Sequence, residues 1–168
     1  MQVALAVVGS IVAALLDTSV APFAMIAGTR PDIVLVSSVV VAVSIGSEAG
    51  FIWAFAGGLT LDLLAAPARP IGSSVVALLV ATGLAAVVAR VAGRNRLATA
   101  ILVTFPLTFV FQFVYGVLVS AALGGVPSGA SLGPGLPAAI ENTILAIPLA
   151  LAARLIWQRW GTFDRIEW

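Results

Sequence analysis

Long apolar runs follow one another along the chain, separated by short segments with polar residues, glycine or proline. Within each run the hydrophobicity is continuous and does not alternate, which favours helices over half-buried strands. A helix needs about 20 apolar residues to cross the hydrocarbon core of a bilayer, and the runs approach this length. The predicted spans are residues 2–21, 31–46, 49–66, 72–92, 98–123 and 137–157.

The composition supports a membrane location. Hydrophobic residues make up 61% of the chain and charged residues 9%, whereas about 25% of the residues of a soluble domain are charged. In lipid the backbone must satisfy its own hydrogen bonds, so the runs are expected to be helices. Six spans nearly exhaust 168 residues. We therefore predict an all-α polytopic membrane protein, with residues 1–168 forming a single transmembrane bundle of about six helices.

The arginines predict how the bundle is oriented. An even number of spans places both termini on one side, and that side holds six of the eight basic residues: Arg90, Arg94, Arg96, Arg154, Arg159 and Arg165. Only Arg30 and Arg69 fall on the other side. Because cytoplasmic loops carry an excess of positive charge, both termini are predicted to be cytoplasmic. Trp157 and Trp160 fit as interfacial anchors of the last span.

The first apolar run differs from a secretory signal peptide. It lacks a basic region before the apolar stretch, contains Asp17 and is longer than the usual apolar part of a signal. We expect it to be retained as the first span.

Four of the seven acidic residues fall near the predicted outer boundary: Asp17, Asp32, Asp62 and Glu141. Ionisable groups at membrane depth are costly and are candidates for a functional site by default. The alternative is that they reach water or pair within the chain, Asp32 with Arg30 and Asp62 with Arg69. The sequence leaves open whether the four acids converge.

Small residues recur every four positions in the third span. Gly50, Ala54 and Gly58 continue into Asp62, which places all four on one helix face. Such a stripe lets another helix approach closely and so favours helix packing in lipid. Asp62 then has a structural or partner-binding role at the outer end of this face. Simple exposure at the helix end is the alternative.

The fifth span carries phenylalanine at the same spacing, at Phe105, Phe109 and Phe113, with Gln112 near the middle of the bilayer. One interpretation is an aromatic ridge that faces lipid or the core, with Gln112 hydrogen-bonded to a neighbouring helix. The other is a groove for the transmembrane helix of a partner protein.

No catalytic or metal-binding motif accompanies these features. The chain has no cysteine and no histidine, which excludes Ser-His-Asp and Cys-His sites and thiolate metal ligation. It also lacks a Walker A or Rossmann glycine pattern. We predict no catalytic residue, metal or cofactor. The arginines are explained by anionic lipid and the positive-inside rule, so we expect no nucleic-acid partner.

An ordered set of short motifs over about 60 residues gives a resemblance to a known family. These are Pro31-Asp32 at the start of a span, then Gly50-Phe51, Gly57-Gly58-Leu59, Leu61-Asp62-Leu63-Leu64 and Gly72. In this order and spacing they resemble MreD, a family of rod shape-determining membrane proteins.

The resemblance implies a non-enzymatic component of the bacterial elongation machinery in the inner membrane. Its expected partner is an MreC-like bitopic membrane protein, and it would act with MreB, RodA and a class B penicillin-binding protein in lateral peptidoglycan synthesis. The family also resembles in fold the substrate-binding subunits of energy-coupling-factor vitamin transporters. That alternative predicts a polar, aromatic-rich outer pocket. The outer loops here have few such side chains, which favours the scaffold.

Overall fold

The computed structural model describes residues 2–24, 28–65, 70–92, 95–124 and 132–160 of the chain; for residues 2, 22, 24, 132–134 and 156–160 only the backbone is described. These residues form six α-helices and a short 3-10 helix: α1 (Gln2–Ser19), η1 (Ala21–Ala24), α2 (Ile33–Ser44), α3 (Ser47–Ala65), α4 (Ser73–Val91), α5 (Arg96–Ala122) and α6 (Leu132–Trp160). The predicted all-α class and six-helix bundle are confirmed.

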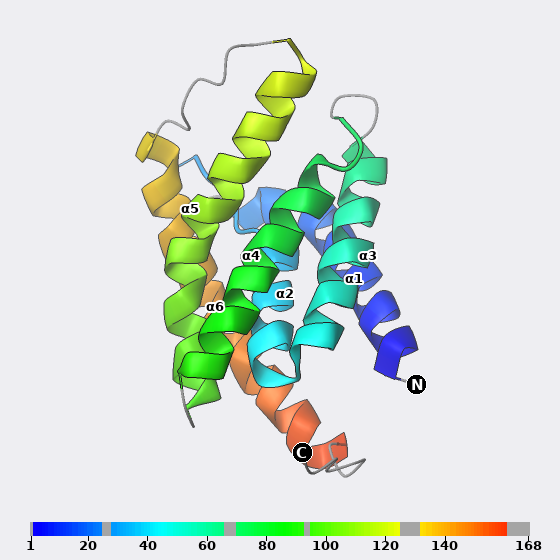
Figure 1. Ribbon diagram of the computed structural model, residues 1–168, viewed down its shortest axis with the longest axis vertical. Coiled ribbons are helices and arrows are strands. Elements are labelled where there is room, and N and C mark those ends of the chain that lie inside the picture. The colour runs from blue at the N-terminus through cyan, green and yellow to red at the C-terminus, as the bar shows by residue number, and fades with distance from the viewer. Residues whose placement is uncertain (1, 25–27, 66–69, 93–94, 125–131, 161–168) are drawn as a thin grey trace.

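The helices run up and down between two ends of the bundle (Figure 1). At the lower end α3 and α5 begin and α4 and α6 end, and we call it the arginine end because Arg90, Arg96 and Arg154 lie in these helix termini. At the opposite end α3 and α5 finish and α4 begins. We call it the carboxylate end, since Asp17, Asp62 and Glu141 lie towards it.

The short helix α2 is the centre of the bundle. It contacts each of α1, α3, α4, α5 and α6, and every residue from Val34 to Val43 is buried. Its 12 residues span about 18 Å, well short of the roughly 30 Å of a bilayer core. Its neighbours shield the middle of α2 from lipid, while the residues at its two ends, Ile33 and Ser44, are partly buried. The backbone groups at these ends need partners.

The outer faces of the surrounding helices are apolar. Leu5 on α1, Leu102 on α5 and Ile144 on α6 are 65%, 71% and 59% exposed. Four of the described helices are long and apolar enough to cross a membrane: Ser47–Ala65, Ser73–Val91, Arg96–Ala122 and Gly135–Leu155. Val3–Ser19 and Ile33–Ser44 are shorter apolar helices. The chain is therefore a polytopic membrane protein, while six crossings and the direction of the termini stay predictions.

Some sequence predictions concern residues outside the described part of the chain. They include Arg69, Arg94 and Arg165 and the side chains of Trp157, Trp160 and Arg159. The pairing of Asp62 with Arg69 belongs to this group.

Candidate functional site

The start of α2 is surrounded by hydrogen-bond acceptors from α1, from α6 and from the residue that precedes α2. The first N–H groups of a helix have no partner within it. Asp32 caps α2, and its Oδ1 accepts from the Leu35 N–H at 3.0 Å. Asp17 Oδ1 accepts from the Ile33 N–H at 2.6 Å, and Asn142 Oδ1 accepts from the Asp32 N–H at 2.7 Å. These bonds join α1 and α6 to the first turn of the central helix.

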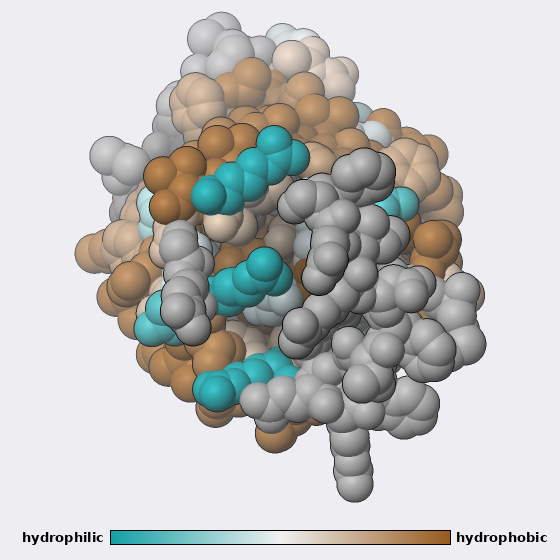
Figure 2. Space-filling view, turned by 60° about the horizontal axis from the view of Figure 1, so that its bottom comes forward, coloured by the Kyte–Doolittle hydropathy of each residue, from teal (hydrophilic) through white to brown (hydrophobic). Residues whose placement is uncertain are grey.

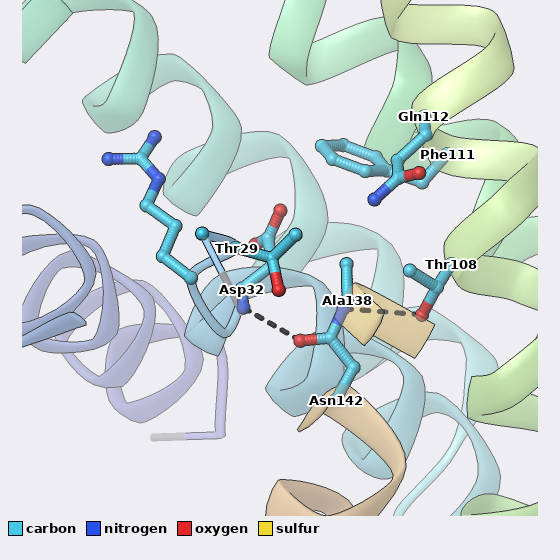
Figure 3. Close-up of a pocket in the computed structure, with 9 residues that line it drawn as sticks. Thr29, Asp32, Thr108, Phe111, Gln112, Ala138 and Asn142 are labelled. Carbon is cyan, nitrogen blue, oxygen red and sulfur yellow. Dashed lines mark hydrogen bonds between the residues drawn. The ribbon is translucent and has the colours of Figure 1, made fainter. Parts of the chain in front are cut away.

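A chain of hydrogen bonds fixes the orientation of the Asn142 side chain. Its amide nitrogen donates to the Thr108 hydroxyl at 3.2 Å, which itself donates to the Thr104 carbonyl at 2.9 Å. The Thr108 hydroxyl thus has no proton left for Asn142 and must accept. The amide oxygen consequently faces the start of α2, where a backbone N–H needs it (Figure 3).

Glu141 lies beside Asn142 on α6 and is 7% exposed. Its Oε1 accepts from the Thr29 hydroxyl at 2.8 Å. Thr29 belongs to the connection that precedes α2, so this bond ties the connection to α6. The second oxygen, Oε2, is buried and has no hydrogen-bond partner within the described residues.

Asp62 caps a different helix. Its two oxygens accept from the backbone N–H groups of Gly72 at 2.7 Å and Ser74 at 3.2 Å, at the start of α4. Gly72 is the N-cap residue, has φ +99° and supplies no side-chain cap. That left-handed conformation favours glycine, which cannot cap its own helix. The fully buried carboxylate of α3 therefore replaces the missing cap.

The structure brings three of the four predicted acids together. Asp17, Asp32 and Glu141 gather around the start of α2 and its preceding connection, whereas Asp62 makes no hydrogen bond to them among the described residues. In the described part of the chain no group of three or more acids is placed to hold a metal ion. Arg30 is exposed and makes no ion pair within the described residues, so the alternative in which Asp32 pairs with Arg30 is not seen there.

The small-residue stripe of α3 faces the interior of this chain. Gly50, Ala54 and Gly58 are buried. A Cβ at position 50 would lie 2.5 Å from the Ala42 Cβ of α2, and one at position 58 would lie 2.8 Å from the Val75 Cα of α4. Contacts this close require the absence of a side chain. The stripe thus lets α3 approach α2 and α4.

The phenylalanine repeat of α5 divides between interior and exterior. Phe105 and Phe109 make an edge-to-face contact with ring centroids 5.6 Å apart. Phe109 also packs at the α6 backbone, where a Cβ at Gly135 would lie 3.0 Å from its ring. Phe113 is 57% exposed and Phe105 is 36% exposed. Part of the repeat thus packs α5 against α6, and the rest faces outwards.

A pocket of about 360 Å³ lies between the start of α2, α5 and α6 (Figure 3). Its lining consists of Gly28, Thr29, Arg30, Asp32, Thr108, Phe111, Gln112, Ala138 and Asn142. Few aromatic and polar groups were expected here because the outer loops have few such side chains. The pocket instead takes Phe111, Gln112 and Asn142 from the helices. Asn142 and Thr108 were not predicted as site residues, although a polar residue within an apolar span can indicate a buried polar site.

The arginine end has a different character. Figure 2 looks toward it and shows elongated hydrophilic side chains over a mostly hydrophobic surface. Arg90 and Arg96 line a second pocket of about 380 Å³ together with small residues of α2, α3 and α4. Arg96 donates to the Ser44 carbonyl at 3.4 Å, at the end of α2. A cation is favourable at that position because a helix C-terminus carries partial negative charge.

Comparison with known proteins identifies the family. A family model described as rod shape-determining protein MreD matches residues 1–159. No curated protein and no solved structure matches the chain. The family match covers both the capped start of α2 and that of α4, and it extends well beyond the motifs of the second to fourth helices. The chain accordingly belongs to the MreD family of rod shape-determining membrane proteins.

Proposed function

We propose that this protein is a non-enzymatic scaffold of the bacterial elongation machinery. It lies in the inner membrane with six spans and both termini in the cytoplasm. It binds an MreC-like bitopic membrane protein and, through it, supports lateral peptidoglycan synthesis by MreB, RodA and a class B penicillin-binding protein. Family membership supports the role in rod shape, and the partners and the wall-synthesis step are part of the proposal.

The scaffold interpretation rests on the hydrogen bonds that three acidic residues at membrane depth accept. The carboxylates of Asp17, Asp32 and Asp62 accept hydrogen bonds from backbone N–H groups at helix starts. Acids engaged in this way hold helices and are poorly placed for proton transfer to a substrate. The remaining surface of the spans is apolar, which suits association with lipid and with other transmembrane helices.

The outward part of the α5 phenylalanine repeat is our candidate for the partner contact. Aromatic side chains bring large contact areas to an interface, and Phe113 is among the most exposed aromatic residues of the bundle. The stripe of α3 contributes indirectly, since Gly50, Ala54 and Gly58 position α3 inside the bundle.

The test is recovery of partners from the native membrane in a mild detergent, with mass spectrometry of the proteins recovered. Phe113→Ala is expected to lower recovery of an MreC-like protein several-fold. Phe55→Ala on α3 is the matched control, because Phe55 is 54% exposed and Phe113 is 57% exposed. Equal recovery from both variants would remove α5 from the interface. Failure of the unmodified protein to recover any bitopic partner or wall-synthesis enzyme would contradict the scaffold.

The orientation has its own test. The chain has no cysteine, so single-cysteine variants can be labelled without background. Leu123 at the carboxylate end is 70% exposed, and Ala92 at the arginine end is also exposed. With a membrane-impermeant maleimide, Leu123→Cys should react in intact spheroplasts and Ala92→Cys only after lysis. The reverse pattern would invert the proposed orientation.

The second candidate, a small-molecule uptake subunit, is favoured by one observation, the pocket at the start of α2. An uptake subunit would recover paired ATPases and a coupling protein in the same experiment. Recovery of wall-synthesis proteins without ATPases would reject it.

A further inference from the structure

The pocket at the start of α2 presents hydrogen-bond donors that the fold does not use. Asn142 is 1% exposed and lines the pocket. Its amide group carries two hydrogens, of which one is donated to Thr108. The other has no acceptor among the described residues. A buried donor without a partner is destabilising, so a ligand that accepts from it would be favoured.

Two further donors lie on the same pocket. Gln112 lines it from α5, is only partly buried, and its side chain makes no hydrogen bond within the described residues. Arg30 lines the pocket from the connection before α2, and its exposed guanidinium has no acidic partner in the described part of the chain. Three donor groups from three segments, one of them cationic, therefore border one cavity.

Asp32 is the acidic residue of the lining, and its charge is already stabilised. Its Oδ1 accepts from the Leu35 N–H and lies at the positive end of the α2 dipole. Arg30 has no comparable compensation within the described residues. Glu141 adds a second carboxylate behind the lining, where its Oε1 accepts from Thr29. The features that favour a negatively charged acceptor are therefore the charge of Arg30 and the donors of Asn142 and Gln112.

One wall of the pocket is aromatic and held in place. Phe111 is 8% exposed and stacks on Tyr115, with ring centroids 5.8 Å apart and planes inclined by 17°. A rigid ring can contact the apolar part of a ligand whose anionic group meets the donors. The volume of about 360 Å³ is near the lower end of the range of small-molecule sites, about 300–1,000 Å³.

We propose that this pocket binds a carboxylate or phosphate group on a molecule the size of a lipid head group. The second amide hydrogen of Asn142, the Gln112 amide and the Arg30 guanidinium donate to the anionic oxygens, and Phe111 contacts the adjoining carbon atoms. The source of the anion is either a free solute or the head group of a membrane lipid. The site does not depend on the scaffold function, since the proposed partner contact lies on the outer face of α5.

The soluble source is tested by thermal unfolding of the purified full chain in an uncharged detergent, with glycerol 3-phosphate and inorganic phosphate as probes. We expect a saturable rise of the melting temperature with glycerol 3-phosphate. Arg30→Gln should raise the apparent Kd at least about tenfold, because a hydrogen bond to a charged group is worth more than the 1.4 kcal/mol of one factor of ten. Arg154→Gln, an exposed arginine in α6 near the arginine end, is the matched control and should leave the Kd unchanged.

The lipid source is tested by native mass spectrometry after transfer from nanodiscs of phosphatidylglycerol or phosphatidylcholine. Retention of phosphatidylglycerol by the unmodified chain and by Arg154→Gln, with loss from Arg30→Gln, supports a lipid head group. Gln112→Leu should weaken either ligand without lowering the melting temperature of the free protein, because the Gln112 side chain makes no hydrogen bond in the described fold.

Two results would overturn the proposal. One is that the unmodified chain binds neither probe and retains no lipid; if Arg30→Gln then lowers partner recovery, Arg30 is a protein contact. The other is that Arg30→Gln and Arg154→Gln respond alike. Both leave the Phe113 experiment unaffected, so failure of the pocket and failure of the scaffold are distinguishable.

Discussion

The two ends of the bundle place their charges in opposite ways. At the carboxylate end Asp17 and Asp62 are 4% and 0% exposed, and each accepts backbone hydrogen bonds at the start of another helix. At the arginine end Arg90 and Arg154 are exposed. The interaction described there for Arg96 is one long bond to the Ser44 carbonyl.

This difference reflects where helices begin. Inside the bundle, α2 and α4 expose unpaired N–H groups away from water, and a carboxylate from a neighbouring helix satisfies them. At the membrane surface water and lipid head groups solvate an arginine without help from the fold. The acids should therefore determine stability, and the arginines should determine orientation. The following substitutions test this division.

Asp62→Leu should have the largest effect. It leaves the N–H groups of Gly72 and Ser74 without acceptors at a helix start where Ser74 is buried and Gly72 is partly buried. At about 1–3 kcal/mol for each unsatisfied group, the loss of unfolding free energy should be about 2–6 kcal/mol. Reversible unfolding in mixed micelles measures it.

The control for Asp62 is Glu48→Gln. Glu48 lies in the first turn of α3 at the arginine end and is exposed. Its substitution should change stability by less than about 0.5 kcal/mol. Equal losses from both variants would contradict a capping role for Asp62.

Gly58→Ala should have the next largest effect. The added Cβ would meet the Val75 backbone at 2.8 Å, and such overpacking costs about 1–3 kcal/mol. Gly83→Ala on α4 is the matched control, since its Cβ would meet the Phe51 ring at an ordinary 3.7 Å. It should be neutral or stabilising by up to about 1 kcal/mol through helix propensity. If both variants unfold at the same temperature, the close contact of α3 with α4 is not important for stability.

Asp17→Asn should have a smaller effect, about 1 kcal/mol. The amide oxygen can still accept from the Ile33 N–H, but a charge-assisted bond is about twice as strong as a neutral one. Thermal unfolding checks this, with Asp17→Leu expected to be less stable than Asp17→Asn. If Asp17→Leu is as stable as Asp17→Asn, α2 needs no acceptor from α1.

Arg90→Gln and Arg96→Gln should have the smallest effect on stability, below about 0.5 kcal/mol each. Combined, they should weaken the orientation bias of the bundle. The single-cysteine variants Leu123→Cys and Ala92→Cys report this as a mixed labelling pattern. If the arginine variants lose as much stability as Asp62→Leu, the proposed difference between the two ends of the bundle is wrong.

The sequence predicted the helices well because continuous apolar runs have few alternatives in a membrane. It also identified the α3 stripe, since Gly50, Ala54 and Gly58 share a face at helical spacing. The partners of that stripe were not predictable. The run Val34–Val43 is apolar apart from Ser37 and Ser38, whose hydroxyls donate to carbonyls of the same helix. Such a run fits a lipid-facing helix as well as a central one.

The polar site was only partly predictable. Asp17, Asp32 and Glu141 were predicted at a similar depth near the outer boundary of the membrane, which suggested that they could meet. They do meet around the start of α2. Asp62 was predicted at the same depth in the membrane. It lies beside the start of α4 instead, where its carboxylate accepts a hydrogen bond from the Gly72 N–H. Asn142 was not singled out because an amide carries no charge, although it contacts both α2 and α5.

The most direct test of the capping account is amide hydrogen exchange of the purified protein, followed by mass spectrometry, in Asp17→Leu and Asp62→Leu. We expect faster exchange confined to the start of α2 in Asp17→Leu and to the start of α4 in Asp62→Leu, where the capped N–H groups lie. Unchanged protection at both helix starts, or the same pattern of change in both variants, would contradict it.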